Sequence, residues 1–174
     1  LHILAHHPAT AKFICTKLAT RFVSDSPPPA LVERMAQTFL KKDGDIREVL
    51  KTLFQSPEFW APESYRAKVK TPLEFVASAV RASGADVNNA LPLVRQLQTM
   101  GMPLYGMQPP TGYSMKAEAW VNSSALLGRM NFALALASGK MKGVQVHASE
   151  LMGGPAAKVG AEQDLDVLEA RLLA

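Results

Sequence analysis

The chain has 174 residues, of which 48% are hydrophobic, and its formal net charge is +4. With a mean hydropathy of +0.02, this composition is typical of a globular protein and excludes an intrinsically disordered one. The length suits one hydrophobic core or a short pair of subdomains. No apolar run reaches the ~20 residues that a membrane-spanning helix needs, so we expect no transmembrane segment.

The basic residues are scattered along the chain rather than gathered in one run. A basic balance can attract nucleic acid or anionic lipid, but no nucleic-acid-binding motif accompanies it here. We therefore interpret the positive charge as solvated surface. Weak binding of nucleic acid or anionic lipid is the third and least favoured functional hypothesis.

Hydrophobic periodicity, together with start and stop residues, predicts a chain of short helices. The predicted helices span residues 8–23, 29–42, 45–56, 71–83, 90–100, 116–138 and 162–173. No convincing pair of strands and no internal repeat accompanies them; residues 144–146 alternate over too few positions to predict a strand. We expect an all-α fold, an irregular orthogonal bundle of about six to eight short helices with a Pro/Gly-rich loop at residues 102–114.

The helix starts are sharply marked. Thr71 is the expected N-cap of its helix, Pro72 suits the first helical position, and Glu74 can reach back to the N–H of the cap. The same pattern predicts Asp45 as an N-cap, with Glu48 as its capping-box partner. These residues are therefore explained by helix capping and need no role in a reaction.

The helix predicted at 116–138 is expected to be long and central, near the C-terminal third of the chain. Residues 125–137 are apolar nearly all round, which is typical of a helix surrounded by other helices. Gly128 within it suggests the close approach of a neighbour, since glycine otherwise costs ~1 kcal/mol in a helix.

We expect a helical domain at 1–139, followed by a weakly patterned, Gly-rich tail at 140–174 that ends in the predicted helix 162–173. The chain begins without a methionine and ends inside that helix, so we expect it to be a fragment of a longer protein. Its expected partners are the remaining regions of that longer chain and, in addition, a separate protein.

Short motifs along residues 2–138 carry a family resemblance. They are, in chain order, His7-Pro8-Ala9-Thr10, Arg21-Phe22-Val23-Ser24-Asp25, Asp43-Gly44-Asp45-Ile46-Arg47, Ser56-Pro57-Glu58-Phe59-Trp60, Lys68-Val69-Lys70-Thr71-Pro72, Gly101-Met102-Pro103-Leu104-Tyr105, Pro110-Thr111-Gly112-Tyr113, Trp120-Val121-Asn122-Ser123 and Arg129-Met130-Asn131-Phe132-Ala133. In these motifs the chain resembles the C-terminal part of a large bacterial family catalogued as domain of unknown function 1800. The resemblance implies a helical fold and favours an exported or cell-envelope location. It supplies no catalytic residue and no cofactor to carry over.

Isolated titratable residues have plain structural interpretations. His2 and His6 are one helical turn apart and could share a metal, but no carboxylate lies near them in the sequence, so we expect no metal site. Glu58 lies in a first helical turn and Glu74 in a capping box, which explains both without acid–base catalysis. Cys15, the only cysteine, excludes an intrachain disulfide and is expected to be a small core residue rather than a reactive thiol.

The best candidate binding residues follow the Pro/Gly-rich loop. Tyr113 leads into a segment that carries Trp120, Asn122 and Asn131. An amide on an apolar helix face must be hydrogen-bonded or it costs ~1–3 kcal/mol. Asn131 is therefore expected to bond to the loop backbone and pin it; the alternative is that these aromatic and amide groups line a pocket.

Three further residues near the strongest family motifs are not explained by capping. They are Trp60, Lys68 and Lys70, and we add them to the candidate binding residues.

The favoured hypothesis is a helical scaffold or binding segment of a larger exported or envelope-associated bacterial protein, since the conspicuous motifs are caps and turns. The alternative is that the segment from Tyr113 to Asn122 forms one wall of an enzyme active site. No catalytic residue and no cofactor can be named from the sequence.

Overall fold

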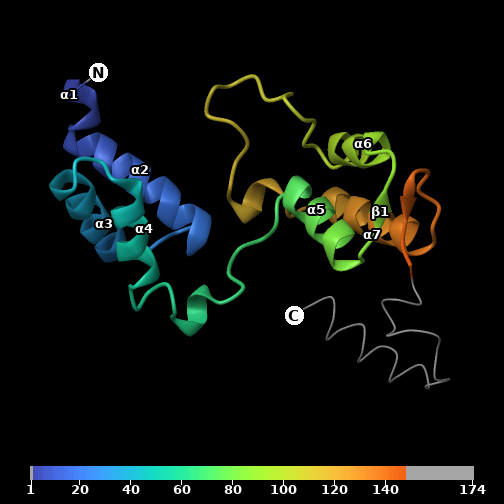
Figure 1. The fold of residues 1–174 in the computed structure, drawn as a ribbon, viewed down its shortest axis with the longest axis horizontal. Helices are drawn as coiled ribbons and strands as arrows, with labels where there is room; N and C mark the ends of the chain where they lie inside the picture. Colours follow the sequence, from blue (N-terminus) through green and yellow to red (C-terminus); the bar gives the residue numbers. More distant parts are fainter. Residues whose placement is uncertain (1, 148–174) are drawn as a thin grey trace. The chain divides into compact units, whose positions relative to one another are not determined.

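The computed structural model describes residues 2–147. Within that range the chain is mostly helical, as predicted, and forms one small antiparallel sheet (Figure 1). The α-helices are α1 His2–Ala5, α2 Pro8–Phe22, α3 Pro29–Lys41, α4 Ile46–Phe54, α5 Pro72–Ala82, α6 Leu91–Thr99 and α7 Ser123–Ala137. Two 3₁₀ turns, η1 Pro62–Ser64 and η2 Ala117–Ala119, and two strands, β1 Asp86–Val87 and β2 Val144–Gln145, complete the elements.

The helix predicted at 162–173 lies outside the described residues. Among the described helices, none is both long and apolar enough to cross a membrane.

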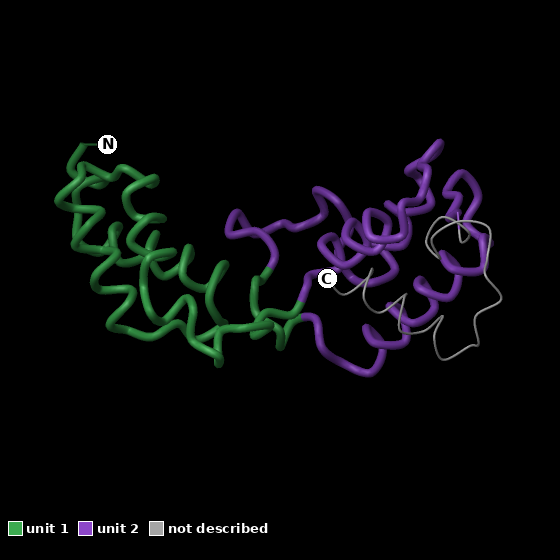
Figure 2. The backbone as a smooth tube through the Cα atoms, turned by 60° about the horizontal axis from the view of Figure 1, so that its bottom comes forward, with its two compact units in different colours: residues 1–69, 114–119 green, residues 70–113, 120–174 purple. Residues whose placement is uncertain are grey.

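The chain divides into two compact units, coloured separately in Figure 2. Unit 1 comprises residues 1–69 and 114–119, and unit 2 comprises residues 70–113 and 120–174. The boundary expected at residue 139 stays a prediction, because most of residues 140–174 lies outside the described part of the chain.

In unit 1, helices α2, α3 and α4 pack around one core. Each contributes small or branched side chains with no exposed surface, among them Cys15, Leu31 and Leu53. Burial raises the pKa of the Cys15 thiol to about 11, so the thiol stays protonated at neutral pH. Cys15 is therefore a core residue, as predicted. The full core cluster consists of Ala11, Cys15, Ala19, Val23, Leu31, Val32, Met35, Ala36, Phe39, Val49 and Leu53.

Capping occurs largely where the sequence predicts it. Glu74 accepts a hydrogen bond from the Thr71 backbone N–H at 2.8 Å, and the Thr71 hydroxyl accepts from the Glu74 N–H, which completes the capping box of α5. Asp45 caps α4 by accepting from the Arg47 N–H at 2.8 Å. The expected partner role of Glu48 is wrong, because its carboxylate pairs with Lys51 at 2.5 Å instead of reaching back to the cap.

In unit 2, α5, α6, α7 and the small sheet share a second core. Val87 of β1 pairs with Val144 of β2 in the sheet. The alternating pattern at residues 144–146 was too short to predict β2 from the sequence. Gly143, which precedes the strand, has a φ of +79°, and a Cβ at this position would lie 2.6 Å from the Asn89 Cβ. Only glycine fits this approach. The buried core residues are Val76, Leu97, Met100, Phe132, Leu136, Met141 and Val144.

The helix predicted at 116–138 differs from the structure in two ways. Its first part is the separate turn η2, and α7 begins only after Asn122, whose side chain accepts from the Ala125 N–H at 2.8 Å. The expectation that this helix is surrounded by other helices is met on one side of it within the described residues. Only Phe132 and Leu136 are buried, because the neighbouring elements of unit 2 cover one face of α7.

Gly128 lies on the covered side of α7. A Cβ there would be 3.6 Å from the Met100 Cγ, which is ordinary packing. The neighbour that was expected is therefore present, but the approach is not close enough to require glycine.

Replacing Phe132 by alanine tests the second core. Phe132 is fully buried, and its ring centroid lies 5.8 Å from that of Phe75 in an edge contact. The substitution should lower the free energy of unfolding by about 3–5 kcal/mol, because it leaves a cavity. The measurement is chemical denaturation followed by circular dichroism. Leu91→Ala is the control, since Leu91 is 61% exposed; equal losses for the two variants would contradict the assignment of this core.

Candidate functional site

Four aromatic rings of unit 1 form a connected aromatic cluster, Phe22, Phe54, Phe59 and Trp60. Successive rings meet edge to face with centroids 5.5, 5.1 and 5.1 Å apart. The Trp60 indole N–H donates to the Phe54 carbonyl at 2.7 Å, yet the residue is 74% exposed. The cluster is thus an aromatic surface that adjoins the core of unit 1, since Phe59 packs against that core.

The turn after α4 places these rings together. Ser56, which is buried, donates its hydroxyl to the Leu53 carbonyl at 2.6 Å and accepts from the Phe59 N–H at 3.3 Å. These two bonds end α4 and reverse the chain, so Phe59 and Trp60 fold back against the ring at the end of the helix.

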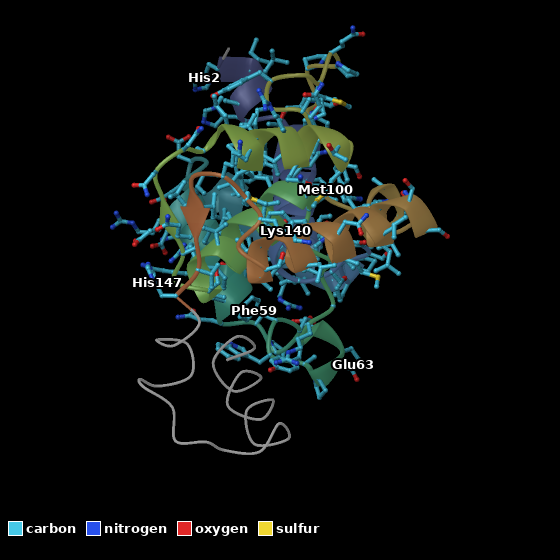
Figure 3. All side chains as sticks on the ribbon, turned by 90° about the vertical axis from the view of Figure 1, so that its right-hand side faces the viewer. His2, Phe59, Glu63, Met100, Lys140 and His147 are labelled. Atoms are coloured by element: carbon cyan, nitrogen blue, oxygen red, sulfur yellow. The ribbon has the colours of Figure 1, made fainter. Side chains whose placement is uncertain are left out.

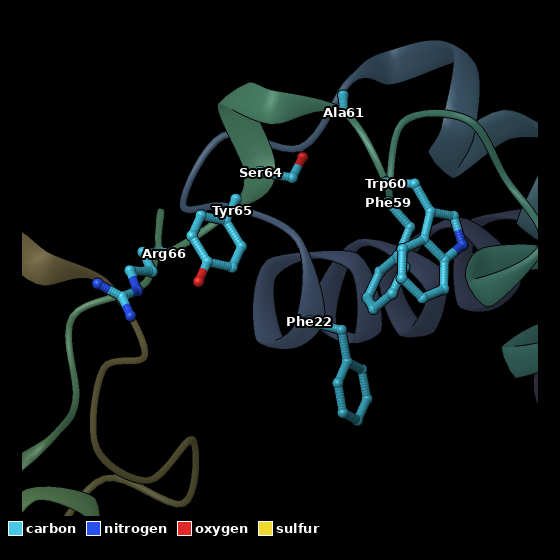
Figure 4. A pocket seen from close by; sticks show the side chains of 7 residues that line it. All are labelled: Phe22, Phe59, Trp60, Ala61, Ser64, Tyr65 and Arg66. Atoms are coloured by element: carbon cyan, nitrogen blue, oxygen red, sulfur yellow. The ribbon is translucent and has the colours of Figure 1, made fainter. Parts of the chain in front are cut away.

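A hollow of about 260 Å³ adjoins the cluster, and Figure 4 shows the side chains around it. Trp60 and Phe59 lie on one side of it, and Tyr65 and Arg66 on the other. Its lining residues are Phe22, Phe59, Trp60, Ala61, Ser64, Tyr65 and Arg66. Ligand pockets for whole cofactors are usually larger, ~300–1,000 Å³, so the hollow suits a single side chain or ring.

The groups around the hollow are suited to recognition. The Arg66 guanidinium lies over the Tyr65 ring at 5.2 Å from its centroid, and the Ser64 hydroxyl donates to the Glu58 carbonyl at 2.7 Å. Tyr65 is 74% exposed. These groups offer ring stacking, cation–π contact and hydrogen bonding, but no nucleophile with an adjacent base.

Lys68 is explained by a structural network within unit 1. Its ammonium donates to Asp25 and, at 2.7 Å, to the Met115 carbonyl. The second carboxylate oxygen of Asp25 accepts from the Ala117 N–H at 2.6 Å. Residues 114–119 are therefore held to unit 1 by one carboxylate and one ammonium, although they lie far from both in the sequence.

This network sets the ionisation of Asp25. Burial alone would raise the pKa of its carboxyl, but the hydrogen bonds from Lys68 and from the Ala117 amide outweigh burial and lower the pKa below its usual value. Asp25 therefore stays charged at neutral pH.

Lys70 and Arg129 belong to unit 2. The Lys70 ammonium donates to the Ser78 hydroxyl at 3.0 Å. The backbone carbonyl of Lys70 accepts a hydrogen bond from the Arg129 guanidinium at 2.7 Å. Arg129 also lies over the Phe75 ring at 5.1 Å from its centroid, and burial lowers its pKa. Arg129, which the sequence did not single out, thus links α7 to the start of α5.

The candidates that follow the Pro/Gly-rich loop have structural partners. The Tyr113 hydroxyl donates to the Pro103 carbonyl at 2.7 Å, and its ring lies 5.9 Å from that of Trp120. Trp120 is 93% buried, with a relative exposure of 7%, and Asn122 caps α7. Asn131 is exposed on α7, and its expected bond to the loop backbone stays a prediction.

The fold brings one carboxylate to the N-terminal histidines. The rings of His2 and His6 stack with centroids 4.1 Å apart, and His6 pairs with Asp43. The backbone carbonyl of His2 and the Asp43 carboxylate both raise the pKa of His6. Among residues 2–147, no group of three or more histidine, cysteine or acidic side chains could hold a metal ion.

Glu58 is not suited to act as a general acid. It pairs with Arg34 at 2.5 Å, and this hydrogen bond, with one from its own backbone N–H, lowers the pKa of Glu58. A general acid at neutral pH needs a raised pKa.

Of the seven candidate residues, only Trp60 lines the aromatic hollow. The sequence reasoning missed Phe22, Tyr65 and Arg66. One signal was present: four of the twelve residues from Phe54 to Tyr65 are aromatic. The contribution of Phe22 from α2 could not be found in this way, because it depends on the packing of α2 against α4.

Removing the charge of Asp25 should loosen residues 114–119. We expect Asp25→Asn to lower the free energy of unfolding by about 1–3 kcal/mol, because it leaves the Lys68 ammonium without its counter-ion. Since the pKa of Asp25 is lowered in the fold, this stabilisation is present above its unfolded pKa of about 3.9 and is lost as the pH falls through the lower folded value. Denaturation at pH 7 and pH 3, with amide hydrogen exchange at Ala117, measures both effects. The control is Glu63→Gln, an exposed acid in the same unit; a loss as large for this variant would contradict the assignment.

The pairing of His6 with Asp43 predicts a titration. The folded pKa of His6 is raised above 6.5, so the contact is fully formed below the unfolded pKa and is lost as the pH rises through the folded value. NMR titration of the His6 ring should give a pKa that falls on Asp43→Asn but stays partly raised by the His2 carbonyl. An unchanged His6 pKa in the variant would contradict the pairing.

Comparison with known proteins gives one match. The model of the family described as "Protein of unknown function (DUF1800)" matches residues 1–174, the whole chain. No curated protein and no solved structure matches. The chain therefore belongs to the DUF1800 family, a protein family of unknown function.

Proposed function

We propose that this chain is a helical binding segment of a larger exported or envelope-associated bacterial protein and that it acts by docking a protein partner. The observation that carries the proposal is the aromatic surface of unit 1, where Trp60 and Tyr65 are each 74% exposed beside the hollow. The exported location is supported by the family resemblance alone.

The physical argument rests on the cost of leaving these rings in water. Burying a large apolar side chain is worth about 1.5–3 kcal/mol, and Trp, Tyr and Arg are the residues that most often dominate binding energy at protein interfaces. Here the tryptophan is already oriented by its hydrogen bond to Phe54, so binding would cost little ordering entropy.

The size and chemistry of the hollow favour a protein partner over a cofactor. A volume of about 260 Å³ accepts one protruding apolar side chain between aromatic walls.

The alternative of an enzyme active-site wall stays a prediction. The segment from Tyr113 to Asn122 motivated it, but each of its candidate residues serves packing or capping in unit 2. We therefore place it second. Binding of nucleic acid or anionic lipid also stays a prediction and ranks third.

Variants of the aromatic surface test the proposal. Immobilised wild-type chain is used to capture proteins from a cell-envelope extract, and the captured protein is purified and titrated against each variant by calorimetry. Trp60→Ala and Tyr65→Ala should each weaken its binding about 10–100-fold, the equivalent of ~1.5–3 kcal/mol, with little change in thermal stability.

Phe13→Ala is the matched control. Phe13 is a 59% exposed aromatic residue on α2 of the same unit but does not line the hollow, so this variant should bind as the wild type does. A partner that binds all three variants equally tightly, or substrate turnover by the purified chain with no partner, would overturn the proposal.

A further inference from the structure

Helix α7 carries an exposed apolar face. Leu126, Leu127, Met130 and Leu134 are 59–69% exposed, and we refer to these four residues as the α7 apolar face. At 100° per residue they fall within an arc of about 100°, the width of the stripe that a helix of a globular protein normally turns toward a core.

The exposure of this face is not a sign that unit 2 lacks a core. Phe132 and Leu136, on the opposite side of α7, are buried in the second cluster. The helix therefore has two apolar sides, and the described residues cover only one of them. Contiguous large apolar side chains left in water usually mark a contact surface.

The charges around the face indicate what can cover it. Residues 120–147 contain three basic side chains, Arg129, Lys140 and Lys142, and no acidic one. The described part of unit 2 as a whole has six basic and two acidic side chains, a formal charge of +4. Two such faces would bring like charges from the described part of unit 2 together, which disfavours their direct pairing in a dimer.

A complementary segment lies in the same chain. Residues 161–173 contain Leu165, Leu168 and Leu172 at the i, i+3, i+7 spacing of one helix face. The same stretch carries four acidic side chains and one basic one, a formal charge of −3. Its sequence therefore offers a narrow leucine stripe and a charge opposite to that of the described part of unit 2.

The connection is long enough for this segment to reach α7. The chain is anchored just before it, because His147, labelled in Figure 3, contacts Asp86 at 3.0 Å and β2 pairs with β1. Residues 148–160 then form a 13-residue connection. By random-coil scaling, 13 residues correspond to a root-mean-square span of ~20 Å, whereas the α7 apolar face extends only ~12 Å along the helix axis. Tethering at this length corresponds to a local concentration of about millimolar.

We propose that residues 161–173 form an amphipathic helix that docks its leucine stripe on the α7 apolar face. The segment would complete the burial of α7 within unit 2, which is what the all-round apolar pattern of residues 125–137 anticipates. The partner on this face is thus a segment of the same chain, and the site is separate from the aromatic surface of unit 1.

Oxidation of Met130 in the full chain tests the proposal. The rate of sulfoxide formation by dilute hydrogen peroxide is measured by peptide mass spectrometry, with Met107, which is 40% exposed, as the internal reference. Leu168→Asp should raise the Met130 rate at least three-fold over the wild type, because it places a charge in the leucine stripe and releases the segment. The Met107 rate should not change.

Ala170→Asp is the matched control. It adds the same charge to the same segment, but on the side of the predicted helix opposite the leucines, and should leave the Met130 rate at the wild-type value. Equal Met130 rates in the wild type and Leu168→Asp would overturn the proposal. It would also be overturned if protection of Met130 disappeared on dilution and light scattering detected a dimer, since the covering partner would then be a second copy.

Discussion

The ion pair between Asp25 and Lys68 is the interaction on which the organisation of this chain depends. The polypeptide leaves unit 1 after residue 69, returns at residue 114 and leaves again after residue 119. Lys68 lies at the first of these crossings, and its ammonium and the Asp25 carboxylate together hold the backbone of Met115 and Ala117. These two charged side chains therefore hold residues 114–119 in unit 1, because each of them satisfies a backbone group of that segment that would otherwise lack a partner.

The residues expected to carry function divide into those whose polar groups serve the fold and those that stay exposed. Most of them have structural roles: Lys68, Asn122 and Tyr113 bond to backbone groups, and Trp120 is buried. Trp60 also donates to a backbone carbonyl, but most of its ring stays in water. A side chain that is oriented by the fold and still exposed is available for recognition, which separates Trp60 from the other candidates.

Exposed apolar surface occurs in both units, and its chemistry differs between them. In unit 1 it consists of rings around a hollow with a guanidinium at the rim. In unit 2 it consists of aliphatic side chains on one helix, in a part of the chain whose charged residues are mostly basic. Rigid aromatic groups favour a separate partner with a defined shape, whereas an aliphatic stripe suits a second amphipathic helix. The two surfaces therefore support two different proposals.

The sequence by itself determined the helical class, most helix starts and the burial of Cys15, because capping and periodicity act within a few residues of the chain. Thr71, Glu74 and Asp45 could be assigned in this way. Only the tertiary structure decided that residues 116–138 break at Asn122, that one side of α7 faces water, and that Phe22 joins Trp60 beside a hollow. These features depend on which distant segments pack together and on where Asp25 and Lys68 find partners, and spacing along the sequence carries no information about either.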